Sequence, residues 1–250
     1  MGAEDNRHDR EHRLELKGEA ERGGGKHPLL RPVDAATLIL IDRSGNEPAL
    51  LMGKRHSAHA FMPDTYVFPG GRRDRNDSRV PVARELQEDV RDKLLLKMPN
   101  PASVARAQGL ATAAVRETYE EAGVMIAAEG RTIASGTWSD FSRLGLAPDL
   151  SRLRLVARAI TPPGRTRRFD TRFFACFRDE IGAAKPKSSN ELLDIRWVPL
   201  SEVSELTMPA ITKTVINDLK NALNADPNIQ FGGPIPFYQA PHGRFRHEVL

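Results

Sequence analysis

Three glutamates lie within five residues of one predicted helix, at Glu117, Glu120 and Glu121 in the stretch RETYEEAGV. With a helical rotation of about 100° per residue, their carboxylates share an arc of about 100° and can converge on one point. Like charges at these spacings destabilise a helix by roughly 0.2–0.5 kcal/mol per pair. A divalent cation, which prefers oxygen ligands, would offset that repulsion. The alternative is a solvated charged face in which Arg116 pairs with Glu120 one turn later.

The rest of this helix supplies the face that packs on the protein. Gly123 stands where a left-handed C-terminal cap is favoured, so we expect a helix from about Leu110 to Ala122. The side opposite the glutamates is mostly apolar and can pack on the protein, so the acidic face is free for chemistry or for water. This apolar side carries Ala111, Val115, Thr118, Tyr119 and Ala122.

Composition points to an ordinary globular protein. The chain has 250 residues, of which 40% are hydrophobic and 28% charged, enough for one large domain or two small ones. The single cysteine, Cys176, allows no internal disulfide and no cysteine-based zinc cluster, which fits a reducing compartment. We find no apolar run of membrane-spanning length and no signal-peptide core near the N-terminus, so we expect a cytoplasmic protein.

Charge patterning excludes an obvious nucleic-acid-binding module. The net charge of +4 is small against 37 basic and 33 acidic residues. No basic run with interleaved aromatic residues is present. Residues 1–31 combine alternating charges with a glycine run, which predicts a disordered or loosely helical tail. We place one domain at 32–226 and an irregular C-terminal tail at 227–250.

Hydrophobic patterning predicts strands on both sides of the acidic helix and a second helix near the end of the chain. Their order favours helices packed on a curved sheet. The first two strands are expected to form a hairpin, because Ser44, Gly45 and Asn46 lie between them. The expected strands are 35–42, 48–55, 65–71, 131–138, 154–162, 167–177 and 194–200, and the late helix spans about 208–224.

The segment at about 73–108 is predicted to be helical. Val82, Leu86, Val90 and Leu94 recur every four residues and indicate a helix of about 15 residues. Asn100 and Pro101 then suit the start of a second short helix. We interpret this segment as a lid or specificity element outside the sheet core.

VFPGG and the later RETYEEAGV together resemble the two halves of the Nudix box, whose pattern is Gly-x5-Glu-x7-Arg-Glu-apolar-x-Glu-Glu-x-Gly-apolar. The resemblance covers about residues 33–205 and is closest to the peroxisomal coenzyme A diphosphatase branch. It implies an α+β Nudix fold, an α/β/α sandwich with a mixed curved sheet, which here carries a helical insert. It also implies Mg²⁺ or Mn²⁺ as cofactor.

Two features depart from the family pattern. Arg116 lies 45 positions after Gly71, which leaves about 31 residues inserted inside the box. Counting back from Arg116, the place of the first box glutamate is held by Gln108, and Thr118 stands where an aliphatic residue is usual.

The resemblance implies a role for each box residue. Glu120 and Glu121 are the expected metal ligands, and Glu117 is either a third ligand or the base that accepts a proton from water. The Gly70 carbonyl is a further candidate ligand. Arg116 is expected to hold Glu120 by a charge-assisted hydrogen bond.

Outside the box, Glu191 precedes a predicted strand where relatives place one more ligand or base, or it is a solvated turn residue. Arg165, Arg167 and Arg168 lie at the entry of the FDTRFF strand and are candidates for binding phosphates, or they are solvated.

The sequence therefore predicts a metal-dependent hydrolase that cleaves a diphosphate linkage in a nucleoside diphosphate derivative. Coenzyme A or its acyl esters lead the substrate list, ahead of ADP-ribose, nucleotide sugars and dinucleotides. The alternative is a catalytically silent Nudix fold that binds a nucleotide as a regulator. The expected partners are the small-molecule substrate and, as one option, a second copy of the chain, with no nucleic acid and no membrane.

Overall fold

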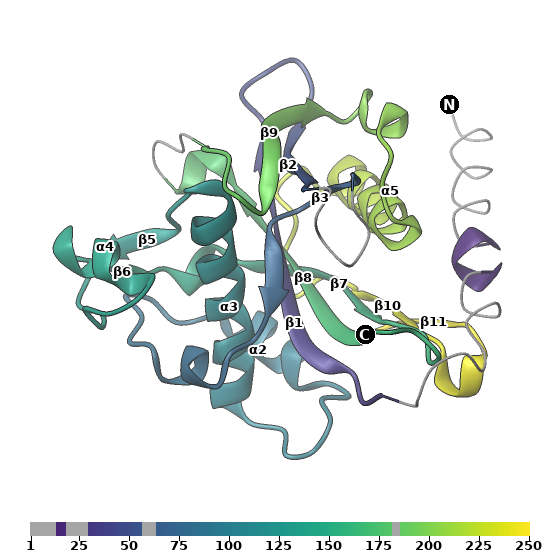
Figure 1. Ribbon diagram of the computed structural model, residues 1–250, viewed down its shortest axis with the longest axis horizontal. Helices are drawn as coiled ribbons and strands as arrows, with labels where there is room; N and C mark the ends of the chain where they lie inside the picture. The colour runs from purple at the N-terminus through teal and green to yellow at the C-terminus, as the bar shows by residue number, and fades with distance from the viewer. Residues whose placement is uncertain (1–13, 19–29, 57–63, 182–185) are drawn as a thin grey trace.

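A mixed sheet runs through the protein and carries helices on both faces (Figure 1). The structure is a computed structural model that describes residues 14–18, 30–56, 64–181 and 186–250. Within this described part, no helix combines the length and apolar character needed to cross a membrane.

The sheet is organised around its central strand β1 (Val33–Asp42). Its first half pairs antiparallel with β4, its last two residues pair antiparallel with β2, and its whole length runs parallel to β8. The order among the described residues is β11-β10-β7-β8-β1-β2-β3, with β4 beside β1 and β9 beside β2. The other sheet strands are β2 (Ala49–Arg55), β3 (Tyr66–Val67), β4 (Gly70–Arg72), β7 (Arg154–Ile160), β8 (Phe169–Phe177), β9 (Leu192–Pro199), β10 (Pro236–Gln239) and β11 (Arg246–Val249).

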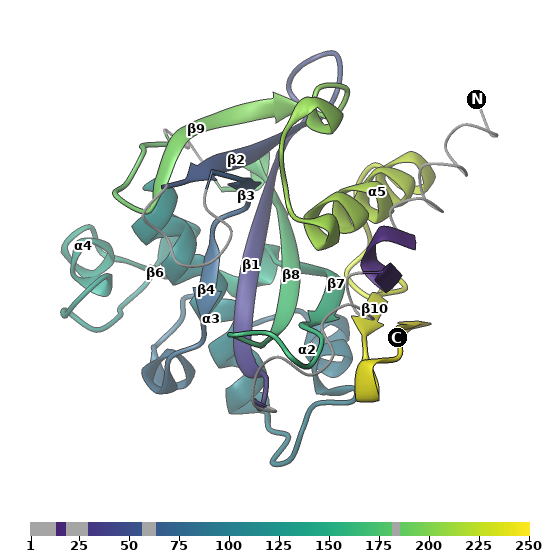
Figure 2. The same ribbon diagram turned by 45° about the vertical axis from the view of Figure 1, so that its right-hand side comes forward.

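Alternation along β1 feeds two separate cores. Leu38 and Leu40 face a core shared with α2 (Glu88–Leu95) and α3 (Val104–Ala122), whereas Ile39 and Ile41 face one shared with α5 (Ala210–Ala225). Figure 2 shows α3 and α5 on opposite sides of β1 and β8. The predicted α+β sandwich is therefore confirmed.

Most predicted elements are present with small shifts of their ends. Strands lie at the predicted places 35–42, 48–55, 154–162, 167–177 and 194–200, and α5 matches the late helix. The predicted strand at 65–71 is divided into β3 and β4 around Pro69, whose carbonyl accepts a hydrogen bond from the Leu38 amide. The two helices predicted before Gly123 form one helix, α3, which begins after an N-cap at Ser103.

The strand predicted at 131–138 is wrong. This stretch contains a left-handed Gly136 and leads into the short helix α4 (Trp138–Arg143). Ile133 is 39% exposed, and the buried aromatic residue of the stretch, Trp138, belongs to α4, so these residues present no buried strand face. Two short strands that we did not predict, β5 (Ala127–Glu129) and β6 (Leu146–Pro148), instead pair with each other on either side of α4.

The insert packs into the core, which contradicts its interpretation as a lid. Of the helix of about 15 residues predicted around Val82–Leu94, only Glu88–Leu95 are helical, and Arg84 before them forms a bridge with Asp149 instead. Val80, Val90, Leu94 and Met98 are buried in the core beneath α3.

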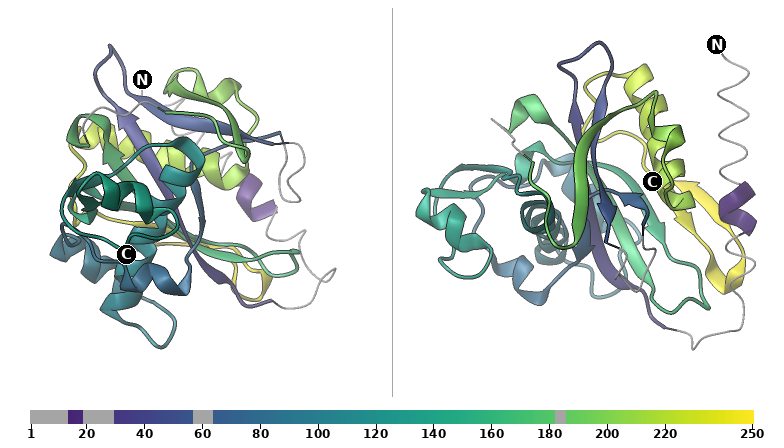
Figure 3. Two further views of the ribbon diagram at one scale, coloured as in Figure 1. Left: turned by 60° about the vertical axis from the view of Figure 1, so that its left-hand side comes forward. Right: turned by 45° about the horizontal axis from the view of Figure 1, so that its top comes forward.

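Both chain ends contribute more structure than the sequence indicated. Residues 14–18 are helical and Leu16 is buried against the second core, although the rest of the predicted 1–31 tail before residue 30 lies outside the described residues. The predicted irregular tail 227–250 forms the antiparallel hairpin of β10 and β11. The C-terminus lies beside the insert (Figure 3, left), where the Lys93 ammonium donates to the Leu250 carbonyl at 2.7 Å.

Candidate active site

Helix α3 brings the three glutamates to one pocket. The helix starts at the Ser103 cap, whose side chain accepts a hydrogen bond from the Arg106 amide, and ends at Gly123 with a left-handed φ of 69°. Its acidic face meets the pocket at strand β4, while Ala111, Val115 and Ala122 are buried. The pocket has a volume of about 1010 Å³ and is also lined by β1, β8, α5 and the C-terminal hairpin.

Glu121 is the most enclosed of the three carboxylates. Its side chain is 6% exposed and accepts a hydrogen bond from the Gly70 amide at 2.8 Å. Burial raises the pKa of Glu121 to about 8, and the negative charges of Glu117 and Glu191 raise it further. The Gly70 hydrogen bond and the charge of Arg55 act in the opposite direction and lower it. An ionised Glu121 is therefore unfavourable here unless a positive charge lies beside it.

Glu117 lies directly against the glycine turn. A Cβ atom at Gly71 would come within 2.4 Å of the Glu117 carboxyl carbon, so only glycine allows this approach. Burial raises the pKa of Glu117, although the charge of Arg116 and its 2.8 Å hydrogen bond act in the opposite direction. The glycines of VFPGG thus serve to bring the carboxylate close to the sheet edge.

Glu120 points toward the open side of the pocket. It accepts a hydrogen bond from Arg116 at 3.1 Å, the contact expected from the sequence, and another from the Thr137 hydroxyl. Thr137 precedes α4 and was not predicted to be near the site. No sequence signal would have placed it there, because its segment was predicted to be a strand.

A residue that sequence reasoning missed anchors Arg116. Asp77 is 2% exposed and accepts two hydrogen bonds from the Arg116 guanidinium, at 3.0 and 3.1 Å. These contacts and the charge of Glu117 raise the pKa of Arg116 even though burial opposes it. Asp77 stands six positions after Gly71, the place of the first box glutamate when counted forward from that glycine.

The position that we assigned to the first box glutamate is therefore wrong. Gln108 lies within α3 and its amide donates to the Val80 carbonyl at 3.3 Å, within the insert. The inserted residues follow Asp77 rather than Gly71. The first box position is therefore found by counting forward from Gly71, not back from Arg116. An aspartate in place of a glutamate made this match easy to overlook.

Glu191 lines the same pocket as the three helix glutamates. Its side chain is exposed, and the Glu191 carbonyl accepts a hydrogen bond from the His56 amide at 3.2 Å. Arg55 also lines the pocket, and its charge acts on Glu121. No sequence pattern singled out Arg55 as a site residue.

The three predicted arginines line the pocket together on the loop between β7 and β8. Arg167 is exposed and Arg165 is half-buried. Arg168 donates to the Thr161 carbonyl at 3.0 Å and to the Leu30 carbonyl at 2.6 Å, so it holds the loop in place. Of the three, Arg167 is the best placed to meet a ligand from solvent.

The donor chemistry of the site suits a hard divalent cation, because three carboxylates, Glu117, Glu120 and Glu121, line the pocket near β4. In the part of the chain that the structure describes, however, no three His, Cys, Asp or Glu side chains already form a metal-binding group. Arg116 holds both Glu117 and Glu120. A cation held by all three carboxylates would require Glu117 and Glu120 to turn from Arg116 toward Glu121.

Comparison with known proteins agrees with this geometry. Residues 103–219 match the model of the NUDIX domain. An acyl-coenzyme A diphosphatase of Gallus gallus is 26% identical over 62% of this chain and 55% of its own length. Its Homo sapiens counterpart is 27% identical over 62% of this chain and 54% of its own length. The chain thus spans about half the length of these relatives.

Among solved structures, a NUDIX hydrolase from Alicyclobacillus acidocaldarius is similar over most of both chains. It is 28% identical, with a TM-score of 0.57 over 80% of this chain and 95% of that one. The match extends well beyond the acidic helix and includes the sheet.

Proposed function

Because the chain belongs to the Nudix hydrolase family, we propose that it uses Mg²⁺ or Mn²⁺ to hydrolyse the diphosphate linkage of a nucleoside diphosphate derivative. One observation carries the proposal: Glu117, Glu120, Glu121 and Glu191 line a single pocket that arginines also line. Carboxylates suit the cation, and arginines suit the phosphates.

Each residue has a distinct task in this proposal. Glu120 and Glu121 hold the metal, with the Gly70 carbonyl as a further oxygen donor, and Glu117 either completes this set or accepts the proton of the attacking water. A bound divalent cation neutralises the charge of the diphosphate and activates water as the nucleophile. Arg116 holds Glu117 and Glu120 in position by its hydrogen bonds. Glu191 is a second candidate for the base.

The arginine loop would bind the phosphates of the substrate. Arg167 is exposed at the pocket rim, and Arg165 and Arg168 line the wall beside it. A guanidinium binds phosphate in a bidentate manner, which would favour substrates with an additional phosphate. We therefore propose coenzyme A or its acyl esters as substrates, which the names of the two curated relatives support.

A substrate screen tests this proposal. The protein is incubated with Mg²⁺ and coenzyme A, an acyl-coenzyme A, ADP-ribose, a nucleotide sugar or a dinucleotide, and products are separated by chromatography. We expect coenzyme A substrates to give 3′,5′-ADP and a phosphopantetheine product, with the highest kcat/KM. A kcat/KM at least tenfold higher for ADP-ribose or a dinucleotide, about 1.4 kcal/mol in transition-state binding, would reject the substrate assignment but retain the diphosphatase.

A further inference from the structure

We infer that the insert positions the C-terminal hairpin, which forms one wall of the pocket. Lys97 and Arg158 connect the insert to this hairpin and thereby affect how tightly the pocket binds long substrates. This inference rests on the proposed function. It assigns the insert a role at the pocket although residues 75–108 do not line it. The contacts run from the insert through β7 to the hairpin.

The hairpin forms one wall of the pocket. Tyr238 and Gln239 of β10 line it, together with Ala240 and Phe245 from the connection between β10 and β11. The rings of Tyr238 and Phe245 stack with centroids 6.3 Å apart, and the Tyr238 hydroxyl donates to Asp218 of α5 at 2.6 Å. Tyr238 is 2% exposed, so Phe245, which is half-buried, is the ring that a ligand can reach, and its face suits an apolar or planar part of a ligand.

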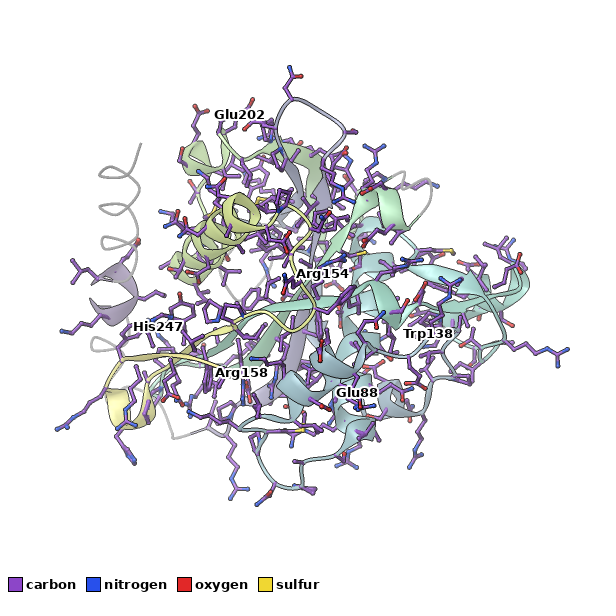
Figure 4. The ribbon with its side chains drawn as sticks, turned by 180° about the vertical axis from the view of Figure 1, so that it is seen from behind. Glu88, Trp138, Arg154, Arg158, Glu202 and His247 are labelled. Carbon is purple, nitrogen blue, oxygen red and sulfur yellow. The ribbon has the colours of Figure 1, made fainter. Side chains whose placement is uncertain are left out.

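Arg158 of β7 joins the insert to the hairpin from behind this wall. Its side chain is 2% exposed and forms a double hydrogen bond with Asp170, at 2.9 and 2.8 Å. The same guanidinium donates to the carbonyls of Leu96 and Lys97 and lies 4.5 Å from the ring centroid of Phe237 in β10. Viewed from behind, Arg158 lies between Glu88 of α2 and His247 of β11 (Figure 4).

Lys97 makes the second connection. Its backbone has a positive φ of 49°, a conformation that costs a non-glycine residue roughly 1 kcal/mol or more. Its ammonium forms an ion pair with Glu248 of β11, and its carbonyl is held by Arg158. These contacts offset the unfavourable backbone conformation and fix the turn of the insert against the hairpin.

The distance across the sheet limits which substrates the hairpin can affect. β10, β7, β8 and β1 are consecutive neighbours, and three interstrand spacings place β10 about 14 Å from β1. The glutamates lie next to β4, on the opposite edge of β1 from β8. A substrate whose diphosphate lies at the glutamates must therefore carry a long arm to touch Phe245.

The test is Lys97→Met, which removes the ion pair and keeps the length of the side chain. We expect the KM for a long-chain acyl-coenzyme A to rise at least fivefold with kcat within twofold, and the KM for ADP-ribose to stay unchanged. Amide hydrogen exchange of residues 236–249 should become faster. Lys97→Arg should restore both readouts, and Lys220→Met on α5 is the matched control that should change neither.

The outcomes separate this inference from the proposed function. Equal changes in KM for long and short substrates, or unchanged KM and exchange in Lys97→Met, would overturn the role of the insert. A wild-type protein that cleaves no diphosphate would refute the proposed function instead. In that case the hydrogen exchange of residues 236–249 in Lys97→Met still decides whether the insert positions the hairpin. Unchanged exchange overturns this role, and faster exchange supports it.

Discussion

Asp77 and Arg116 show how a single pair of residues fixes the catalytic helix to the glycine turn. Asp77→Ala removes both hydrogen bonds to a guanidinium that is almost fully buried. Arg116 keeps its ion pairs with Glu117 and Glu120. The lost contacts are two charge-assisted hydrogen bonds at a mostly buried site, each worth roughly 1.5–3 kcal/mol, so we expect the free energy of unfolding to fall by about 3 kcal/mol. Urea denaturation measures this change.

Two further variants make that prediction specific. Asp77→Glu introduces the acidic residue that the family pattern has at this position and should restore most of the stability. Asp92→Ala removes an acidic residue from an exposed ion pair and should change the free energy of unfolding by less than about 0.5 kcal/mol. Equal losses for Asp77→Ala and Asp92→Ala would contradict the anchoring role of Asp77.

Glu121 predicts how the stability of the metal-free protein depends on pH. Its pKa is about 8 in the folded protein, mainly because of burial, and 4.5 is the usual value. A raised pKa means that the folded state binds the proton more tightly, so its stability contribution is complete below about pH 4.5. That contribution, on the order of 5 kcal/mol at most, is lost as the pH rises from about 4.5 to about 8.

Thermal unfolding between pH 5 and pH 9 in the presence of a chelator measures this loss. The Glu121→Gln variant keeps an acceptor for the Gly70 amide and cannot ionise, so its melting temperature should depend less on pH. Because Mg²⁺ competes with the proton for the carboxylates, its stabilising effect should grow toward high pH. A wild-type and Glu121→Gln protein with the same pH dependence would show that Glu121 is not the group responsible.

At the scale of elements, the insert is part of the core. Leu94 is 2% exposed and packs beneath α3, so Leu94→Ala should lower the free energy of unfolding by about 3 kcal/mol. Leu96 is 44% exposed two residues later, and Leu96→Ala is the matched control with an expected loss below about 1 kcal/mol. Urea denaturation of both variants decides whether the insert is core or a detachable lid.

Elements with a long buried face could be predicted from the sequence, and those fixed by distant contacts could not. The apolar run of β1 and the four-residue spacing of α5 are continuous local patterns, and both elements were predicted. The extent of α2 depends instead on the bridge between Arg84 and Asp149, 65 positions away. The hairpin of β10 and β11 depends on its pairing with β7, which no local pattern reveals.

The same distinction applies to the site. Glu117, Glu120 and Glu121 could be identified because they share one helix face. Asp77 lies 39 positions from Arg116, beyond the usual box spacing, and the wall formed by Tyr238 and Phe245 comes from the far end of the chain. Long-range assembly therefore determines the part of the site that would select the substrate.

For the whole molecule, the central claim is that the carboxylates of α3 bind the metal that hydrolyses a diphosphate. The most direct test compares kcat of wild-type protein, Glu120→Gln and Glu121→Gln at saturating Mg²⁺, on the best substrate of the screen, with circular dichroism as the control for folding. We expect both variants to fold and to lose at least about 100-fold in kcat, because a neutral side chain weakens metal-dependent transition-state stabilisation by several kcal/mol. Folded variants that both turn over at nearly the wild-type rate would contradict the claim.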